Sequence, residues 1–521
     1  MIYIDYDKIR KPAYIYAFLP VLFFVGVYSA SIITILLSVG AVAFLIWDWH
    51  KGEKVDCKPV AIRYSMLVAF FVIAFLWSFL GGQGNLYYQS SDWTVRNLLY
   101  RDLIYRSWPV TYPDFDKALC YYIGYWLPTA AITKVIGIFF PMIYETELAF
   151  RIGNILLLIW TTVGVFIVEL LLTCYAAPKT NLKMYLVPVI LIFFSGLDII
   201  GAIRKILVYH EPLGTHIEWW LSGLQFSSLT TCLFWVFNQT IVPWIVILCI
   251  MQEQDFSHYI LLATAALSSG PIPFCGIAVY MLFNAIYKGI VAVRTKKIKD
   301  FLKDCFTPLN CMLLLFVPVI LLFYSSNAAI SAGTEEATSD TFSILFFTVR
   351  KLTPMICAKI LVFLFMEAGI YLILLYRSNK KNIFYYATIM VALIAPLLKI
   401  GLADDFVMRF SIPAVMSMAA MSLKFLSEYE FTVDVQTQSK HSLREKIECA
   451  VLIVCLLIGS VTPLTEFMRG YMATLQSGKI DNIAIDPRIQ TLNQDENHGD
   501  SNFVTYGYKE KLYFKLFLKD E

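Results

Sequence analysis

The stretch IGNILLLIWTTVGVFIVELLLTC, at Ile152–Cys174, decides the class of this protein. At 1.5 Å per residue, a helix of this length crosses a hydrocarbon core about 30 Å thick. Comparable apolar stretches recur along the whole chain, which predicts an all-α polytopic membrane protein. They lie at Tyr14–Trp47, Ala61–Leu80, Leu119–Phe140, Ile152–Cys174, Leu186–Ile200, Phe234–Ile250, Tyr259–Ile290, Cys311–Tyr324, Ile356–Tyr376, Ile383–Ile400, Phe410–Phe425 and Ala450–Pro463.

The composition of the chain agrees with this class. Hydrophobic residues make up 58% of the sequence and charged residues only 16%, whereas soluble domains carry about 25% charged residues. The net charge of +3 indicates no polyanionic partner, so nucleic acid is not expected. The 11 scattered cysteines are interpreted as small buried apolar residues. The sequence lacks the phosphate-binding loop of a pump that carries its own ATPase domain, and this class is excluded.

Two of the apolar stretches, Tyr14–Trp47 and Tyr259–Ile290, are too long for one crossing. We predict breaks at Tyr28–Ser31 and Ser269–Pro273, where serine, glycine and proline interrupt the apolar runs. The count is then about 12–14 transmembrane helices. They form a transmembrane domain of residues 1–463, and residues 464–521 form a short extracytoplasmic tail or cap.

Lysine and arginine between the stretches set the expected sidedness, because cytoplasmic loops are enriched in them. The basic N-terminus and the basic residues within 51–63, 294–299, 377–381 and 440–446 place these segments inside. Residues 83–118, 327–354, 402–409 and the tail after 464 then lie outside. Counting crossings forward from the N-terminus and backward from Arg294 assigns opposite sides of the membrane to the segment between Pro141 and Lys183. This disagreement predicts one half-helix or re-entrant segment there. We expect a multi-pass protein of a bacterial cell membrane with a cytoplasmic N-terminus.

The first outer loop, residues 83–118, is the longest, and its middle predicts a helix that lies at the membrane interface. Asp92 stands four residues before Arg96, so the two side chains share a face of this helix. Asp92 is a candidate catalytic or metal-binding carboxylate, with Arg96 as a candidate substrate ligand. The alternative is that Asp92 is a first-turn acid that complements the helix dipole after a serine cap. Asp102 is a second candidate catalytic acid.

A second polar cluster contains His210, Glu211, His216 and Glu218. Clusters of histidine and glutamate bind metal ions or shuttle protons, although this spacing fits no standard zinc pattern. We interpret the two glutamates as candidate catalytic residues and the two histidines as candidate substrate ligands.

Two further groups are candidate substrate ligands. Gln225 and Asn238 are amides among aromatic residues, where they would line a pocket or serve ordinary helix packing. Asp404, Asp405 and Arg409 stand at the outer mouth of a helix. Arg409 either holds a phosphate through two-point contacts or pairs with Asp405, four residues before it.

The long acidic loop is followed by YYIGYWLP at Tyr121–Pro128, then Lys134, then AFRI at Ala149–Ile152. This layout resembles the GT-C superfamily of membrane glycosyltransferases, which includes oligosaccharyltransferases, protein O-mannosyltransferases and aminoarabinose transferases. The resemblance covers about the first half of the chain. It implies a GT-C-like architecture, a sugar donor on polyprenyl phosphate, Asp92 at the active site and Arg409 at the lipid phosphate.

The resulting hypothesis is an enzyme that transfers a sugar from a polyprenyl-phosphate-linked donor to an extracytoplasmic glycan or glycolipid acceptor. Such a transfer needs a base for the acceptor and cations for the leaving phosphate, at the level of the lipid headgroups. The participation of a divalent cation, Mg²⁺ or Mn²⁺, is left open, and no metal ligands are assigned. The alternatives are a secondary transporter, whose family traits include internal repeats, and a scaffold or lipid-linked-sugar flippase without catalysis.

Overall fold

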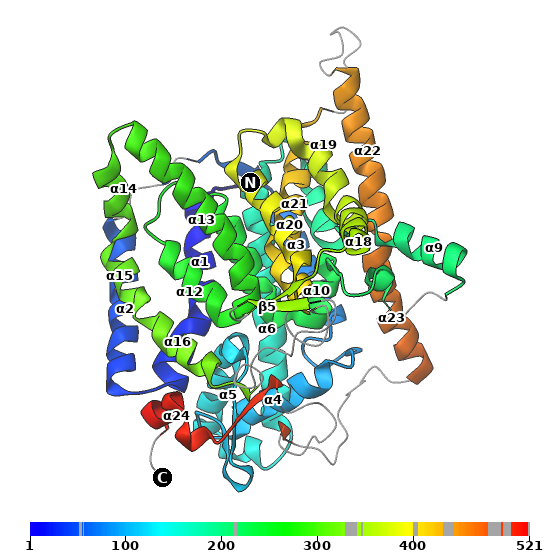
Figure 1. Ribbon diagram of the computed structural model, residues 1–521. Helices are drawn as coiled ribbons and strands as arrows, with labels where there is room; N and C mark the ends of the chain where they lie inside the picture. The colour runs from blue at the N-terminus through cyan, green and yellow to red at the C-terminus, as the bar shows by residue number, and fades with distance from the viewer. Residues whose placement is uncertain are drawn as a thin grey trace.

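The computed structural model describes residues 1–51, 55, 57–211, 216–328, 341–344, 347–399, 405–430, 442–477, 491–492 and 502–518. This part of the chain is almost entirely helical, which confirms the predicted class. The helices pack side by side in one bundle, with the N-terminus and the C-terminal segment at opposite ends (Figure 1). The chain adds three small antiparallel sheets in its described part, ordered β1-β2, β3-β4-β8 and β5-β6-β7.

The elements follow the apolar stretches of the sequence. The first are β1 (Ile2–Ile4), α1 (Tyr6–Phe23), η1 (Phe24–Tyr28), α2 (Ile32–Lys51), β2 (Val60–Ile62), α3 (Tyr64–Leu80), α4 (Trp93–Tyr105), β3 (Thr111–Tyr112), β4 (Lys117–Leu119), α5 (Leu127–Phe139) and α6 (Leu148–Ala176). The middle ones are α7 (Asn181–Met184), α8 (Leu186–Phe193), α9 (Asp198–Tyr209), η5 (Ile217–Trp220), α10 (Leu229–Val236), η6 (Phe237–Gln239), α11 (Ile241–Ile250), α12 (Tyr259–Ser269), α13 (Pro271–Arg294), α14 (Ile298–Cys305), α15 (Pro308–Leu314) and α16 (Phe316–Ser325). The last are β5 (Thr341–Ile344), β6 (Phe347–Arg350), α18 (Pro354–Leu364), η7 (Phe365–Gly369), α19 (Ile370–Asn379), α20 (Ile383–Ile394), β7 (Leu398–Lys399), α21 (Asp405–Glu428), α22 (Leu443–Gly459), α23 (Val461–Ser477), β8 (Val504–Tyr506) and α24 (Leu512–Phe517).

Among the described residues, eight helices are long and apolar enough to cross a membrane, or up to ten if two bent helix pairs each count as one span. Four further apolar stretches fold as helices of 10–17 residues. The 12–14 helices expected from the sequence include stretches of this kind, so that count stays a prediction.

Both predicted breaks are confirmed. The first long stretch divides after Tyr28, and α2 begins at Ile32. The other divides between α12 and α13, where Pro271 and Pro273 follow Gly270. Proline lacks the backbone N–H and is accepted in the first turn of a helix, so Pro271 ends one helix and begins the next.

Helix α5 lies just before the window in which a half-helix or re-entrant segment is predicted. Tyr100 of α4 donates to Thr129 near the start of α5, and Lys134 farther along donates to the backbone carbonyl of Arg106. Arg101 of α4 pairs with Glu147, which precedes α6. Helix α5 therefore lies against α4, at one end of the bundle (Figure 1). The bent pair Asn181–Phe193 and Asp198–Val208, which begins inside the window, is a broken span or a re-entrant loop, and the predicted window of Pro141–Lys183 stays a prediction.

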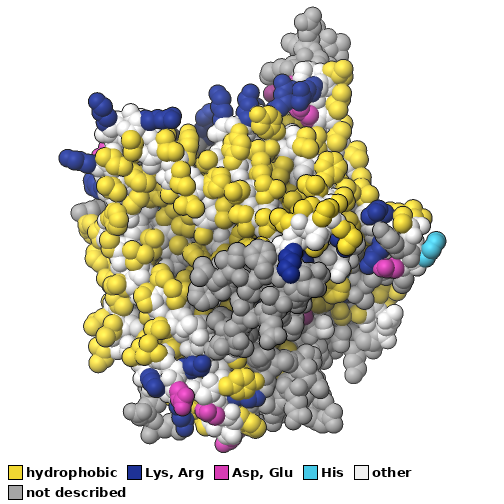
Figure 2. All heavy atoms as spheres, viewed as in Figure 1, with side chains coloured by type: hydrophobic (Ala, Val, Ile, Leu, Met, Phe, Trp, Pro, Cys, Tyr) yellow, Lys and Arg dark blue, Asp and Glu magenta, His cyan; other side chains and the backbone are white. Residues whose placement is uncertain are grey.

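A broad apolar band covers the visible face of the bundle, with lysine and arginine side chains along one edge (Figure 2). The N-terminus, α14, the turn between α19 and α20 and the start of α22 lie at this end (Figure 1). These are segments that the sequence predicted to lie inside. Helices α4 and α24 lie at the opposite end, which is called the outer end below.

The helix predicted in the first outer loop is present as α4, but it is not an exposed interfacial helix. Most of its side chains are buried. Strand β4, from the same loop, pairs with β8 of the C-terminal segment, with Lys117 opposite Tyr506. The helix that starts at Leu443 continues through α23 as far as Ser477. The loop and the C-terminal segment therefore form one outer layer beneath the bundle.

We predict that α14 and the outer layer lie on opposite sides of the membrane. In intact cells, a cysteine introduced at Asp116 should react with a membrane-impermeant maleimide, whereas one introduced at Lys299 should react only after the membrane is permeabilised. Both side chains are exposed. A background without the 11 native cysteines is the control. Labelling of position 299 in intact cells would reverse the orientation.

Candidate functional site

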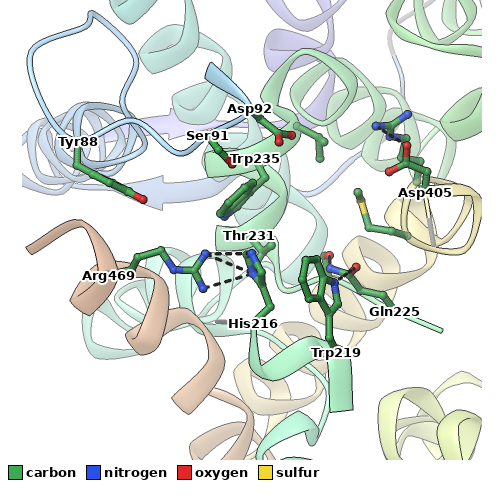
Figure 3. Close-up of a pocket in the computed structure, with 14 residues that line it drawn as sticks. Tyr88, Ser91, Asp92, His216, Trp219, Gln225, Thr231, Trp235, Asp405 and Arg469 are labelled. Atoms are coloured by element: carbon green, nitrogen blue, oxygen red, sulfur yellow. Dashed lines mark hydrogen bonds and ion pairs between the residues drawn. The ribbon is translucent and has the colours of Figure 1, made fainter. Parts of the chain in front are cut away.

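A cavity of about 660 Å³ opens at the outer end of the bundle, where α4, η5, α10, α21 and α23 approach one another (Figure 3). It is called the outer cavity. It is lined by Tyr88, Ser91, Asp92, His216, Trp219, Gln225, Ser227, Thr231, Trp235, Val236, Asp405, Met408, Arg409 and Arg469. All three polar clusters found in the sequence contribute to this wall.

Asp92 contributes a carboxylate from the start of α4. Its side chain makes no capping hydrogen bond to the helix, so capping does not explain the residue. Instead, one carboxylate oxygen accepts from Nη2 of Arg96 at 2.9 Å. The carboxylate is 47% exposed and the guanidinium only 5%. The Nη1 group of Arg96 is buried and makes no hydrogen bond within the described chain. A buried cation thus holds a half-exposed anion at the edge of the cavity.

Asp405 and Arg409 repeat this arrangement in the first turns of α21. Arg409 Nη2 lies 3.2 Å from the Asp405 carboxylate, and the arginine is the less exposed partner, at 14% against 47%. The Nε group of Arg409 is buried and makes no hydrogen bond within the described chain. The predicted ion pair is therefore present, and the same arginine also lines the cavity.

The two ion pairs face a common neighbour, the buried side chain of Tyr121. Burial raises the pKa of this phenol, while Arg409 and Arg96 lower it and Asp405 and Asp92 raise it. Helices far apart in the sequence thus bring two arginine–aspartate pairs close enough to influence one tyrosine.

His216 and Arg469 form another part of the wall (Figure 3). The guanidinium of Arg469 lies 3.2–3.3 Å from the ring nitrogens of His216 and 3.0 Å from Glu466. Glu466 also accepts from the indole N–H of Trp235 at 2.8 Å. Trp219 and Trp235 lie beside the imidazole of His216, with distances between ring centroids of 4.4 and 4.6 Å.

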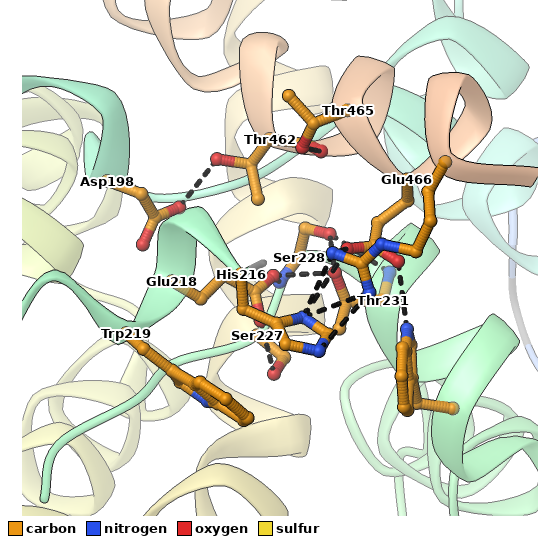
Figure 4. A network of polar contacts seen from close by, with 12 residues as sticks. Asp198, His216, Glu218, Trp219, Ser227, Ser228, Thr231, Thr462, Thr465 and Glu466 are labelled. Atoms are coloured by element: carbon orange, nitrogen blue, oxygen red, sulfur yellow. Dashed lines mark hydrogen bonds and ion pairs between the residues drawn. The ribbon is translucent and has the colours of Figure 1, made fainter. Parts of the chain in front are cut away.

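Glu218 lies directly behind the cavity wall and orients its polar groups (Figure 4). One carboxyl oxygen accepts from Gln225 at 2.7 Å and Ser227 at 2.9 Å. The other accepts from the backbone N–H of Ser228 at 2.9 Å and from Thr231 at 2.6 Å. Three of these four donor residues line the cavity.

Burial raises the pKa of Glu218 to about 8, and the nearby acids Asp198 and Glu466 add to the shift. The hydrogen bonds from Thr231 and Ser228 oppose it. The loss of hydration outweighs these donors because the side chain is almost entirely removed from water. Glu218 is therefore largely protonated at neutral pH.

Two more buried acids lie behind Glu218. Asp198 accepts from Ser195 at 2.8 Å and from Thr462 at 2.9 Å. Glu367 accepts from the indole N–H of Trp220 at 2.8 Å. Oδ1 of Asp198 and Oε2 of Glu367 are buried and make no hydrogen bond within the described chain.

The remaining predicted residues do not line the outer cavity. Asp102 is buried, and its carboxylate accepts from Tyr112 at 2.6 Å and from Thr491 and Leu492 at 3.0 Å, which ties α4 to the C-terminal segment. Burial raises its pKa. Its contacts are those of a structural residue.

His210 and Glu211 are exposed beyond α9, where Glu211 pairs with Lys205 at 2.9 Å. Asn238 is buried at the bend between α10 and α11 and makes no hydrogen bond within the described chain. Asp404 lies outside the described residues.

Sequence reasoning missed Glu466 and Arg469, because residues after 463 were taken as an outer tail. The sequence did contain a sign of these residues, because Glu466 and Arg469 are opposite charges three residues apart in a largely apolar helix. Ionisable residues in such a setting need a partner or a function. Tyr88 and Trp235 were also missed as lining residues, since aromatic residues are too frequent in this chain to be informative singly.

Compared with known proteins, the chain matches no protein-family model, no curated protein and no solved structure. Among the residues that the structure describes, no three His, Cys, Asp or Glu side chains at the outer cavity are close enough to hold a metal ion together.

We predict that the protonated Glu218 makes the stability of the protein depend on pH. Between pH 4.5 and 8 the folded state keeps a proton that the unfolded chain releases, so stability falls as pH rises, by up to about 1.4 kcal/mol per pH unit. Glu218→Gln should remove this component. Thermal unfolding in detergent, followed by tryptophan fluorescence from pH 5 to 9, measures it, with Glu145→Gln at an exposed site as the control. If the unfolding temperature of wild type and of Glu218→Gln changed with pH in the same way, the raised pKa of Glu218 would be contradicted.

Proposed function

We propose that this protein is a membrane glycosyltransferase that moves a sugar from a polyprenyl-phosphate-linked donor to an acceptor on the outer side. One observation carries the proposal. The outer cavity joins a half-exposed carboxylate, two arginines and three aromatic side chains at the outer end of α21. A lipid-linked donor cannot leave the bilayer, so its phosphate and sugar have to be met where helix ends reach the water.

The arginines suit the phosphate of the donor. Within the described chain, the buried Nε group of Arg409 makes no hydrogen bond, and Arg469 faces the cavity across His216. Guanidinium groups bind phosphate oxygens through two parallel hydrogen bonds, and they stabilise the charge that develops as the phosphate leaves. Trp219, Trp235 and Tyr88 offer flat apolar faces for a sugar ring.

Asp92 suits the role of general base. Like Asp405 beside Arg409, it is a lining acid that faces water while an arginine fixes its position, and the GT-C resemblance favours Asp92 of the two. A base has to be ionised at the working pH and within reach of the acceptor hydroxyl. Glu218 does not suit this role, because it is largely protonated and its oxygens are already occupied by donors from the wall.

A second candidate function is a secondary transporter that couples a polar solute to protons. The observation that favours it is the group of buried acids Asp198, Glu218 and Glu367 beside two broken helices. The pair α8 and α9 is bent by 43°, and α10–η6 and α11 by 102°. Transporters build their sites from such interrupted helices and intramembrane carboxyls. Reconstituted vesicles distinguish the two: a transferase produces glycosylated acceptor without a solute gradient.

We predict that Asp92→Asn lowers transfer by on the order of a hundredfold or more, because the amide cannot accept the acceptor proton. Folding should change by only about 1 kcal/mol, since the asparagine oxygen can still accept the hydrogen bond from Arg96. Transfer from a polyprenyl-phosphate sugar in membranes measures the effect, with thermal unfolding in parallel. Asp114→Asn, an exposed acid of the same outer layer, is the matched control. Wild-type activity in Asp92→Asn would remove this residue from the chemistry.

We predict that Arg409→Lys weakens binding of a short-chain polyprenyl phosphate by about tenfold, because lysine lacks the planar two-point contact. Asp405→Asn should leave binding intact or tighter, since it releases the arginine from its ion pair. Binding is measured on detergent-purified protein, with Arg444→Lys as the control, because Arg444 is an exposed arginine that also pairs with an acid four residues away. Equal binding by wild type and Arg409→Lys would assign Arg409 to the ion pair alone.

A further inference from the structure

A second group of polar side chains lies at the inner end of the molecule, away from the outer cavity. The connection between α11 and α12 carries Glu253, Asp255 and His258. One potential ligand atom from each lies within 4.8 Å of the other two. The first helices of the chain close over this connection, because Tyr6 and Tyr14 of α1 and Asp48 of α2 all reach it.

Two ligand atoms in this group are buried and make no hydrogen bond within the described chain. They are Oε2 of Glu253 and Nδ1 of His258, on side chains that are each only 6% exposed. Leaving a buried acceptor unpaired is costly, so such atoms call for a partner. Asp255 adds a carboxylate, of which Oδ1 accepts from the backbone N–H of Ser257 at 2.8 Å.

The other atoms of the same side chains are held by hydrogen bonds. Nε2 of His258 lies 2.8 Å from the carboxylate of Asp48, which makes this nitrogen the donor and leaves Nδ1 with a lone pair. Oε1 of Glu253 accepts from the hydroxyl of Tyr6 at 2.6 Å and from that of Tyr14. A histidine bonded through its far nitrogen to a carboxylate, next to an oriented carboxylate, is the outer-shell pattern of metal sites.

The neighbouring cations leave room for a further positive charge. Arg10 lies 3.9 Å from Oε2 of Glu253 but is closer to Asp7, at 2.8 Å. Lys288 donates to the backbone carbonyl of Gln254 rather than to a carboxylate. The acids are therefore only partly balanced by the arginine and lysine around them.

We infer that Glu253, Asp255 and His258 bind a divalent first-row transition-metal ion. Imidazole nitrogen favours zinc, and carboxylate oxygen favours manganese, so these two ions are the expected occupants, with Mg²⁺ weaker. The ion links α1 and α2 to the α11–α12 connection through the residues that hold its ligands. This site lies outside the outer cavity and is independent of the function proposed for it.

Purified protein in detergent tests the site by equilibrium dialysis against Mn²⁺ or Zn²⁺, with metal counted by mass spectrometry. Mn²⁺ is the cleaner probe, because the 11 cysteines offer thiols to zinc. We expect one Mn²⁺ per chain and a higher unfolding temperature in its presence. His258→Gln and Asp255→Asn should each weaken binding at least tenfold, and Asp48→Asn by about 10–100-fold. His50→Gln and Asp300→Asn, exposed at the same end, should bind as wild type does.

Two results would overturn the inference. One is wild-type protein that binds no stoichiometric Mn²⁺ or Zn²⁺. The other is wild-type affinity in Asp255→Asn, whose half-buried side chain makes it the variant best able to fold. Loss of binding in both ligand variants, with both controls unaffected, supports the site even if His258→Gln is less stable.

Discussion

A charge that leaves water has to meet an opposite charge or a hydrogen-bond donor, and this constraint shapes both ends of the bundle. At the outer end, Arg96 and Arg409 are buried while their aspartates reach the cavity. The arginines are therefore fixed by the protein, and the carboxylates remain accessible. Glu218 satisfies the same constraint differently, by keeping a proton and collecting four donors. Fixed cations beside accessible anions give the cavity its preorganised charge.

Local features of this fold could be predicted from the sequence because their causes are local. Serine and proline ended helices where expected, and the two arginine–aspartate pairs followed from a spacing of four residues. The convergence of α4 and α21 on Tyr121 depends on packing between segments some three hundred residues apart and has no local sign. Hydropathy alone does not distinguish a crossing helix from a short apolar one such as α5, which stays against α4.

The candidate site shows the same division between local and distant causes. His216, Gln225 and Glu218 come from one short stretch and could be recognised as a polar cluster. Its opposite wall comes from α23, beyond the point where the sequence was taken to leave the membrane. Asp102 looked like Asp92 in the sequence, yet its environment is closed by Tyr112 and Leu492. Whether an acid is solvated or enclosed depends on tertiary contacts, and those contacts set its chemistry.

The buried acids behind the cavity depend on two departures from regular helix geometry. Glu367 lies in the π-helical turn η7 between α18 and α19, and such turns are frequent at functional sites. The chain opposite breaks between α8 and α9 at Gly196, where a Cβ atom would come within 1.7 Å of a Glu367 carboxyl oxygen. A larger residue would fit there only if the Glu367 side chain moved. Asp198, at the start of α9, raises the pKa of Glu218. Trp220, two residues after Glu218 in η5, donates to Glu367, so both irregular turns interact with the segment behind the cavity wall.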